Sequence, residues 1–225
     1  MSDDGQRLDI PIFPLENVVL FPRVQVPLHI FEPRYRQMAR EAIDGDGRIG
    51  MVVVRPDQQG GMQGNPDVFA IGCAGEIQRA DELPGGRFNI VLAGTSRFEI
   101  LKEDPPEGER MYRRAEVSTL EDLYPEDDRP VVLALRGEVH DLMRQLLTIV
   151  APDRVEMFEQ QPIAQMDDES FVNALSQSID FAPQEKQALI ESDAVRQRYE
   201  RLAEFMQFRL AELTSGGSSG PGVVH

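Results

Sequence analysis

One stretch decides the predicted fold, "VFAIGCAGEIQRADELPGGRFNIVLAGTSRFEILKE" at residues 68–103. Apolar and polar residues alternate on both sides of "PGG" at 84–86, which predicts two long strands joined as a hairpin. Gly75 and Gly94 interrupt these strand patterns, and glycine at such positions favours a bulge or a sharp bend. Several bent strands indicate a small barrel in preference to a flat sheet.

The rest of the first half is also rich in strand patterns. Short apolar runs predict further strands at 8–15, 24–30, 48–54 and 112–120. Proline cannot donate a hydrogen bond to a ladder, so Pro11, Pro14 and Pro27 are expected at edges, bulges or strand ends.

A polar cluster follows the second of these strands, in "PLHIFEPRYRQM" at residues 27–38. The cluster comprises His29, Glu32, Arg34, Tyr35 and Arg36. It is either a catalytic group or the joint between a strand and a helix. Pro33 is suited to the first position of a helix. An apolar stripe at helical spacing follows it, made of Tyr35, Met38, Ala42 and Ile43.

The chain becomes helical after about residue 125. The segment 129–150 carries an apolar stripe on one face, and shorter helices are predicted at 169–179, at 183–190 and from about 195 onward. Asp168, Pro183 and Asp193 are suited to begin these three helices. We therefore predict a β-rich, barrel-like subdomain at 1–124 and a helical subdomain at 125–214. The remainder, 215–225, has the composition of a disordered linker.

Composition excludes some classes of partner. The chain has 225 residues, 41% of them apolar, and a net charge of −16. The apolar content is sufficient for a core. The negative charge repels phosphate, so we expect neither nucleic-acid binding nor binding to an anionic membrane.

The single cysteine, Cys73, cannot form a disulfide within the chain, which fits a reducing compartment. The N-terminal residues show no secretory signal, and no apolar run approaches the roughly 20 residues that span a bilayer. We expect a cytoplasmic protein.

A search for cofactor and metal motifs finds none. The sequence has no Gly-Lys pair, which a phosphate-binding loop requires. The three histidines, His29, His140 and His225, show no metal-ligand spacing. We predict no cofactor and no metal.

Catalytic nucleophiles are equally weak candidates. Ser96 lacks the G-x-S-x-G context, and a Ser–Lys pair could use only Lys102 or Lys186. Cys73 lies in an alternating strand, where a small buried thiol is the usual outcome. We predict no catalytic residues.

The opening region resembles a known family. Residues 10–54, "IPIFPLENVVLFPRVQVPLHIFEPRYRQMAREAIDGDGRIGMVVV", are similar to the N-terminal, substrate-binding domain of the ATP-dependent Lon protease. Further similar pieces follow in the family's order at 71–100, 112–117 and 185–206, so the resemblance covers roughly residues 8–213.

The resemblance implies an α+β fold, with a PUA-like bent β-barrel followed by a helical subdomain. In this family the "FEPRY" stretch joins a barrel strand to the first helix, which implies that Glu32, Arg34 and Tyr35 form a structural junction. We hypothesise that Glu32 pairs with an arginine, and we name Arg97 as the partner. Lon continues into ATPase and protease modules, and we expect neither here.

The implied role is non-catalytic binding of protein or peptide clients, unfolded or damaged ones among them, with a full-length Lon protease as a second candidate partner. Val18, Phe21 and Pro22 are the candidate client-binding residues, and Phe21 is the expected exposed contact. The alternative for this segment is that Val19 and Leu20 plug the end of the barrel. The oligomeric state stays open.

Two other functions are alternatives. The first is a peptidase or related hydrolase, which the absence of a nucleophile–base arrangement opposes. The second is an RNA-binding PUA-like module, which the negative charge opposes unless Arg110, Arg113 and Arg114 form a local basic face.

Overall fold

The hairpin predicted at residues 68–103 is present as two strands, β4 (Ile71–Leu83) and β5 (Arg87–Asp104). The structure is a computed structural model that describes residues 5–58, 64–160 and 165–216. At the predicted bend the register shifts after Ala74, and Gly75 pairs with Gly94. The predicted irregularity at these two glycines is confirmed.

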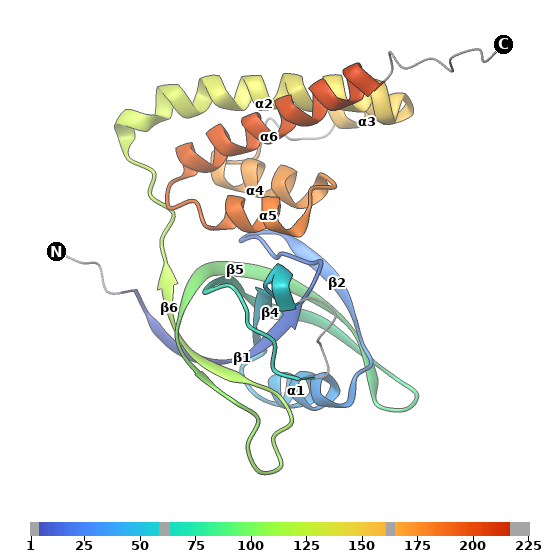
Figure 1. The fold of residues 1–225 in the computed structure, drawn as a ribbon, viewed down its shortest axis with the longest axis vertical. Helices are drawn as coiled ribbons and strands as arrows, with labels where there is room; N and C mark the ends of the chain where they lie inside the picture. Colours follow the sequence, from blue (N-terminus) through green and yellow to red (C-terminus); the bar gives the residue numbers. More distant parts are fainter. Residues whose placement is uncertain (1–4, 59–63, 161–164, 217–225) are drawn as a thin grey trace. The chain divides into compact units, whose positions relative to one another are not determined.

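Six strands form one sheet in the order β2-β5-β4-β3-β1-β6. The other four strands are β1 (Arg7–Leu15), β2 (Gln25–Ile30), β3 (Arg48–Val53) and β6 (Arg114–Leu120). Because β5 also pairs with β6, the strands β5, β4, β3, β1 and β6 close into a barrel (Figure 1). Only β1 and β3 pair in parallel among the described strands.

Strand β1 changes partner in its middle, which explains how it holds two prolines. Residues 7–11 pair with β6, and residues 12–15 pair with β3. Each half therefore has a ladder on one side, and Pro11 and Pro14 fall in different halves. A proline is tolerated where one side of the strand needs no donor.

The barrel interior is filled by apolar side chains from every strand of the ring. These buried residues are Ile10, Ile12, Val52, Val54, Val68, Ala74, Phe98, Ala115 and Val117. The inward positions alternate along β1 and β6, as a strand with one buried face requires.

Two proline-started helices complete the barrel. Helix α1 (Pro33–Asp44) follows β2, and helix α5 (Pro183–Ile190) lies at the opposite end of the barrel in Figure 1. Both predictions of a helix opened by proline are confirmed, since each proline occupies the first turn. Three short 3₁₀ turns also occur, at Pro56–Gln58, Glu126–Asp128 and Pro152–Arg154.

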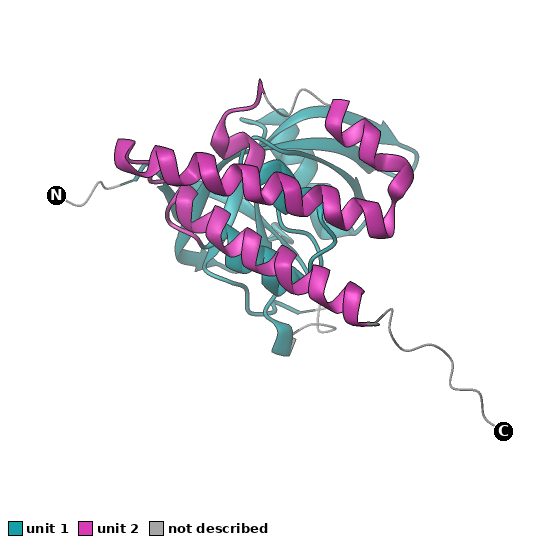
Figure 2. Cartoon of the chain, turned by 90° about the horizontal axis from the view of Figure 1, so that it is seen from above, with its two compact units in different colours: residues 1–121, 173–191 teal, residues 122–172, 192–225 magenta. Residues whose placement is uncertain are grey.

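Contacts divide the chain into two compact units, shown in Figure 2. Unit 1 comprises residues 1–121 and 173–191, and unit 2 comprises residues 122–172 and 192–225. The chain passes from one unit to the other after residues 121, 172 and 191, and the second of these points lies within helix α4 (Asp168–Ser178).

This grouping differs from a division of the sequence at 124/125, because residues 173–191 belong with the barrel. Two amides in this segment make the connection. Asn173 donates to the carbonyl of Pro22 at 3.2 Å, and Gln187 donates to the carbonyl of Ile71 at 3.0 Å. Of the tail predicted at 215–225, residues 217–225 lie outside the described residues.

Unit 2 is helical and is built on the contact of α2 (Arg129–Val150) with α6 (Val195–Gly216). The predicted stripe of α2 is largely buried, with contributions from Val132, Val139, Leu142 and Leu146. Helix α3 (Val155–Gln160) returns along α2, and its Phe158 stacks on the His140 ring at 5.0 Å.

Polar side chains bond to the first turns of α4 and α6 in unit 2. Asp167, and not Asp168 as predicted, caps α4, because its carboxylate accepts from the backbone N–H of Ser170 at 2.9 Å. Asp168 instead accepts from the Tyr124 hydroxyl at 2.6 Å and from Arg136 at 2.7 Å. The Arg198 guanidinium, fully buried, donates to both carboxylate oxygens of Asp122 at 2.8 and 2.7 Å.

Candidate functional site

The joint between β2 and α1 is a backbone turn whose polar residues serve the helix start. The Glu32 carbonyl accepts from the N–H groups of Tyr35 at 3.1 Å and Arg36 at 2.8 Å. Its carboxylate accepts from Arg34, at 3.1 Å from Nε and 3.0 Å from Nη2. Glu32 thus pairs with an arginine, but the predicted partner, Arg97, is wrong. An arginine two residues away reaches this carboxylate with little loss of chain entropy.

Arg97 has a different role within unit 1. It is buried, and its guanidinium donates to the carbonyls of Ile190 at 3.1 Å and Glu121 at 3.0 Å. A buried carbonyl without a donor is costly, so this side chain holds two distant segments of unit 1 in place.

Helix α1 holds the loop that leads into β6. The Gln37 side chain donates to the carbonyl of Glu109 at 3.0 Å and accepts from the N–H of Met111 at 2.9 Å. The Tyr112 hydroxyl donates to the carboxylate of Glu41. Side-chain hydrogen bonds from Gln37 and Glu41 therefore hold residues 109–112 against this side of α1.

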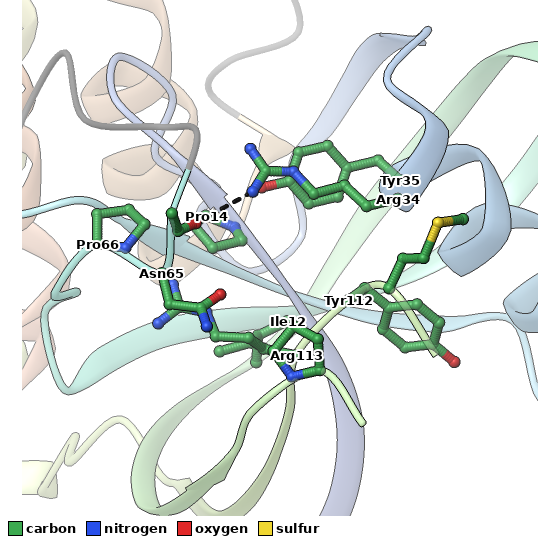
Figure 3. A pocket seen from close by; sticks show the side chains of 11 residues that line it. Ile12, Pro14, Arg34, Tyr35, Asn65, Pro66, Tyr112 and Arg113 are labelled. Carbon is green, nitrogen blue, oxygen red and sulfur yellow. Dashed lines mark hydrogen bonds between the residues drawn. The ribbon is translucent and has the colours of Figure 1, made fainter. Parts of the chain in front are cut away.

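A pocket lies beside this loop (Figure 3). Its wall includes three prolines and two tyrosines, together with two arginines and an asparagine. The lining residues are Ile12, Pro14, Arg34, Tyr35, Gly64, Asn65, Pro66, Pro106, Met111, Tyr112 and Arg113. The cavity volume is about 10 Å³, which is the room that one water molecule needs.

The two arginines of the pocket differ in their contacts. Arg34 donates to Glu32 and to the carbonyl of Gly64 at 3.2 Å, and its guanidinium lies 4.6 Å from the centre of the Tyr35 ring. Arg113 is only 8% exposed, and its Nη1 lies 2.9 Å from a carboxylate oxygen of Glu103. Its Nη2 is buried without a hydrogen-bond partner within the described residues.

Tyr35 belongs to both the joint and the pocket. Its ring packs against Phe13 at 4.5 Å between centroids, and only 5% of the residue is exposed. Burial raises the pKa of the Tyr35 hydroxyl above its usual value, with the Arg34 charge acting in the opposite direction. The hydroxyl is therefore neutral at physiological pH and can donate.

The segment proposed for clients is mostly buried. Phe21 is 0% exposed, so the expectation of an exposed Phe21 is wrong. Pro22 is buried as well, and Val18 is half-buried. The segment lies against the irregularity at Gly94, because the carbonyl of Phe21 approaches Gly94. The carbonyl of Pro22 accepts a hydrogen bond from Asn173. Val19 and Leu20 are also buried, in agreement with the alternative reading of this segment as a plug.

Residues that could perform catalysis are engaged elsewhere. The Lys102 ammonium bonds to Asp104 at 2.7 Å, and the Lys186 ammonium donates to the carbonyl of Gln177 at 2.8 Å. No hydrogen bond among the described residues joins either lysine to Ser96. His29 bonds to Asn89 at 2.7 Å. His225 lies outside the described residues. No cluster of three or more potential metal ligands occurs in the part of the chain that the structure describes.

The arginines considered as an RNA-binding face are also occupied. Arg113 pairs with Glu103, and Arg114 pairs with Asp9 at 3.1 Å. Arg110 donates to the carbonyl of Pro105 at 2.8 Å. These contacts offset the charge that a phosphate backbone would need.

Sequence reasoning did not identify the pocket. Its walls come from β1, α1, residues 64–66 and the loop before β6, which are distant in sequence. The one available signal was Arg113, which directly precedes β6, but it was considered only as part of a basic group.

None of the helices among the described residues combines the length and apolar character needed to cross a membrane.

Comparisons with known proteins identify the family. A sequence-family model, described as "ATP-dependent protease La (LON) substrate-binding domain", matches residues 9–207 of this chain.

Curated relatives include the Lon proteases of two bacteria. The Cytophaga hutchinsonii protein is 29% identical over 198 residues, which cover 88% of this chain and 24% of that protein. The Parabacteroides distasonis protein is 30% identical over 212 residues, which cover 91% of this chain and 24% of that protein. The chain thus spans about a quarter of the length of these relatives.

Solved structures share the fold. The N-terminal domain of the Mycobacterium avium complex Lon protease has a TM-score of 0.67 at 16% identity, with 89% of this chain and 98% of that chain covered. A Lon N-terminal domain protein from Xanthomonas campestris has a TM-score of 0.57 at 21% identity, with 88% and 99% covered. The α+β fold predicted from sequence is confirmed. With a family model matched over residues 9–207, this chain belongs to the Lon substrate-binding domain family.

Proposed function

We propose that this chain binds segments of other proteins in their unfolded state and performs no chemistry on them. The observation that carries the proposal is the match to a substrate-binding domain over residues 9–207. The lack of an assembled nucleophile or metal cluster among the described residues is in keeping with it. Neither the peptidase nor the RNA-binding alternative has an observation in its favour.

The surface supports such a role in a modest way. Large apolar side chains are exposed on each unit, including Phe31 (62%) and Met111 (47%) in unit 1 and Leu133 (68%) and Phe208 (63%) in unit 2. Single exposed apolar residues are ordinary on a soluble protein. We therefore expect weak binding through several separate contacts, which only an unfolded client can make at the same time.

Binding can be tested with one protein in two states. A small disulfide-bonded protein is labelled with a fluorophore and used either native or reduced and blocked with iodoacetamide. Titration with the purified chain should raise the anisotropy of the unfolded form only. Equal anisotropy curves for the two forms, or no change for either, would contradict the proposal.

Two further parts of the proposal have their own measurements. Casein incubated with the chain, with and without ATP, should remain intact, since no catalytic group is assigned. A full-length Lon protease is the proposed second partner, and co-elution in gel filtration tests it. We place the protein in the cytoplasm, on the basis of its one cysteine, and cell fractionation tests that location.

A further inference from the structure

The pocket beside α1 contains two polar groups that no described residue satisfies. The first is Nη2 of Arg113, which is buried without a partner. The second is the hydroxyl of Tyr35, which forms no hydrogen bond among residues 5–58, 64–160 and 165–216 and is not one of the buried side-chain atoms that lack a partner there. In Figure 3 the Tyr35 ring lies on one side of the pocket, and the Arg113 side chain lies on another.

Both groups are hydrogen-bond donors under physiological conditions. A guanidinium is always charged and offers no acceptor. The hydroxyl of Tyr35 remains protonated, since burial raises its pKa. Leaving the buried Nη2 of Arg113 unsatisfied is costly, and the Tyr35 hydroxyl offers a second donor beside it, so the pocket favours an occupant that accepts two hydrogen bonds. A water molecule could accept both, but it must also place its own two hydrogens, whereas a carboxylate oxygen has none.

The residues around the pocket opening indicate the chemical character of the rest of the ligand. Pro14, Pro66, Pro106 and the half-exposed Met111 surround the donors with apolar surface. The small cavity admits an atom of the size of one oxygen, so the remainder of a ligand must lie on the rim. A carboxylate attached to an apolar peptide segment has this combination.

The two glutamates already bonded to the pocket's arginines leave one donor of Arg113 open. Glu103 occupies Nη1 of Arg113, and Glu32 occupies Arg34. Glu32 bonds to Nε and Nη2 of Arg34, and Glu103 bonds to Nη1 of Arg113, so neither carboxylate is bonded to Nη2 of Arg113. The added charge-assisted hydrogen bond would go to Nη2 of Arg113, a buried guanidinium nitrogen without a partner among the described residues.

We infer that the Arg113–Tyr35 pocket receives a carboxylate of a client segment, either its C-terminal carboxylate or an aspartate or glutamate side chain. The inference rests on the proposed client binding and names one of its contacts. It makes Arg113 and Tyr35 specificity residues that favour acidic and apolar segments over neutral ones.

The test uses four fluorescein-labelled peptides with the same apolar core. One has a free C-terminal carboxylate and one a C-terminal amide. The other two are amidated and carry either one aspartate or the matching asparagine. Anisotropy titration of the full chain should show about tenfold tighter binding of at least one carboxylate peptide than of its neutral partner. The pair that differs identifies the source of the carboxylate.

Two substitutions link the preference to the pocket. Tyr35→Phe removes a hydroxyl with no protein partner, so the melting temperature should not fall, and the carboxylate preference should shrink about fivefold. Arg113→Lys retains charge near Glu103 but removes Nη2, and the preference should disappear. Tyr124→Phe makes the same truncation in unit 2, where the hydroxyl bonds to Asp168, and should leave the preference unchanged.

The outcomes separate this inference from the proposed function. Equal affinities within both peptide pairs, or an unchanged preference in the stable Tyr35→Phe variant, would overturn the inference. If the same samples still bind the unfolded protein and not its native form, client binding stands without this contact. Loss of that discrimination in the wild-type chain would instead overturn the proposed function.

Discussion

Gly75 and Gly94 face each other across β4 and β5 at the point where the ladder shifts its register. Thr95 is left without a paired residue there, and its hydroxyl donates to the carbonyl of Ala74 at 3.0 Å. A Cβ at residue 94 would lie 2.1 Å from the Phe21 carbonyl oxygen, whereas a Cβ at residue 75 would lie 2.7 Å from the Leu92 side chain. The bend of the barrel and the position of the segment containing Phe21 thus both depend on the Gly75–Gly94 pair.

Gly94→Ala should therefore destabilise the chain by about 3 kcal/mol, because a backbone carbonyl cannot move aside without displacing its segment. Gly75→Ala should cost less, about 2 kcal/mol, because the new Cβ would meet side chains, those of the buried Leu92 and Leu20, and not backbone. Denaturation in urea, followed by circular dichroism, measures both free energies of unfolding.

Gly137 in α2 provides the matched control. A Cβ there would meet nothing within 4 Å, and the residue lies within a helix. Gly137→Ala should raise the free energy of unfolding by about 0.5–1 kcal/mol. A Gly94→Ala variant as stable as the wild type would show that the close approach to Phe21 is not a constraint.

Arg97→Met should destabilise the chain by about 2–4 kcal/mol, because the buried carbonyl of Ile190 would lose its donor and the carbonyl of Glu121 would lose its bond from the same side chain. Arg97→Lys should recover part of this loss, since an ammonium can satisfy one carbonyl. The control is Arg79→Met, which removes an exposed pair with Asp81 and should change the free energy of unfolding by less than about 1 kcal/mol. Equal losses at the two arginines would contradict the assigned role of Arg97.

The Asp122–Arg198 pair should show strong coupling in a double-mutant cycle. Arg198 is fully buried and Asp122 nearly so, with side-chain exposures of 0% and 8%. Asp122→Asn or Arg198→Met alone should cost about 3–5 kcal/mol, because each leaves a buried charge unpaired. The double variant should cost much less than the sum. Additive losses would indicate that the two side chains act independently.

Alkaline pH should destabilise the chain through its tyrosines. All four, Tyr35, Tyr112, Tyr124 and Tyr199, have raised pKa values, and burial is the largest cause for each. Burial and the hydrogen bond to Asp168 raise the pKa of Tyr124 to about 12. The unfolded chain loses these protons near pH 10 and the folded chain loses them later, so the free energy of unfolding is retained below pH 10 and falls between pH 10 and 12.

Absorbance at 295 nm distinguishes the two states. At pH 11 the native chain should contain less tyrosinate than the chain in guanidinium chloride. The sequence has only two lysines, Lys102 and Lys186, so few other side chains titrate in this range. Tyr124→Phe should lessen the slope of stability against pH, and native tyrosines that are half-ionised at pH 10 would contradict the prediction.

Local signals predicted most of the fold. Alternation located β4 and β5, and the "PGG" turn joined them correctly. Proline at the first helical position located the starts of α1 and α5. These signals depend on neighbours in sequence, which is why they can be identified without the structure.

Features that depend on distant partners were not predicted. Phe21 belongs to an apolar run, but its carbonyl lies against Gly94, and the carbonyl of the next residue, Pro22, accepts from Asn173, both far along the chain. The partner of Glu32 was misidentified because Arg97 is occupied by the carbonyls of Ile190 and Glu121. The pocket of Tyr35 and Arg113 was missed because its walls come from four separate segments.

The return of residues 173–191 to unit 1 has a consequence for synthesis. During translation the barrel strands, which end at Leu120, leave the ribosome long before Ile190 can accept its bond from Arg97. The nascent barrel therefore lacks this bond to Arg97 until most of unit 2 has been made. We expect ribosome-bound chains stalled at about residue 160 to be cut readily by protease within the barrel, and chains that expose residue 191 to resist it.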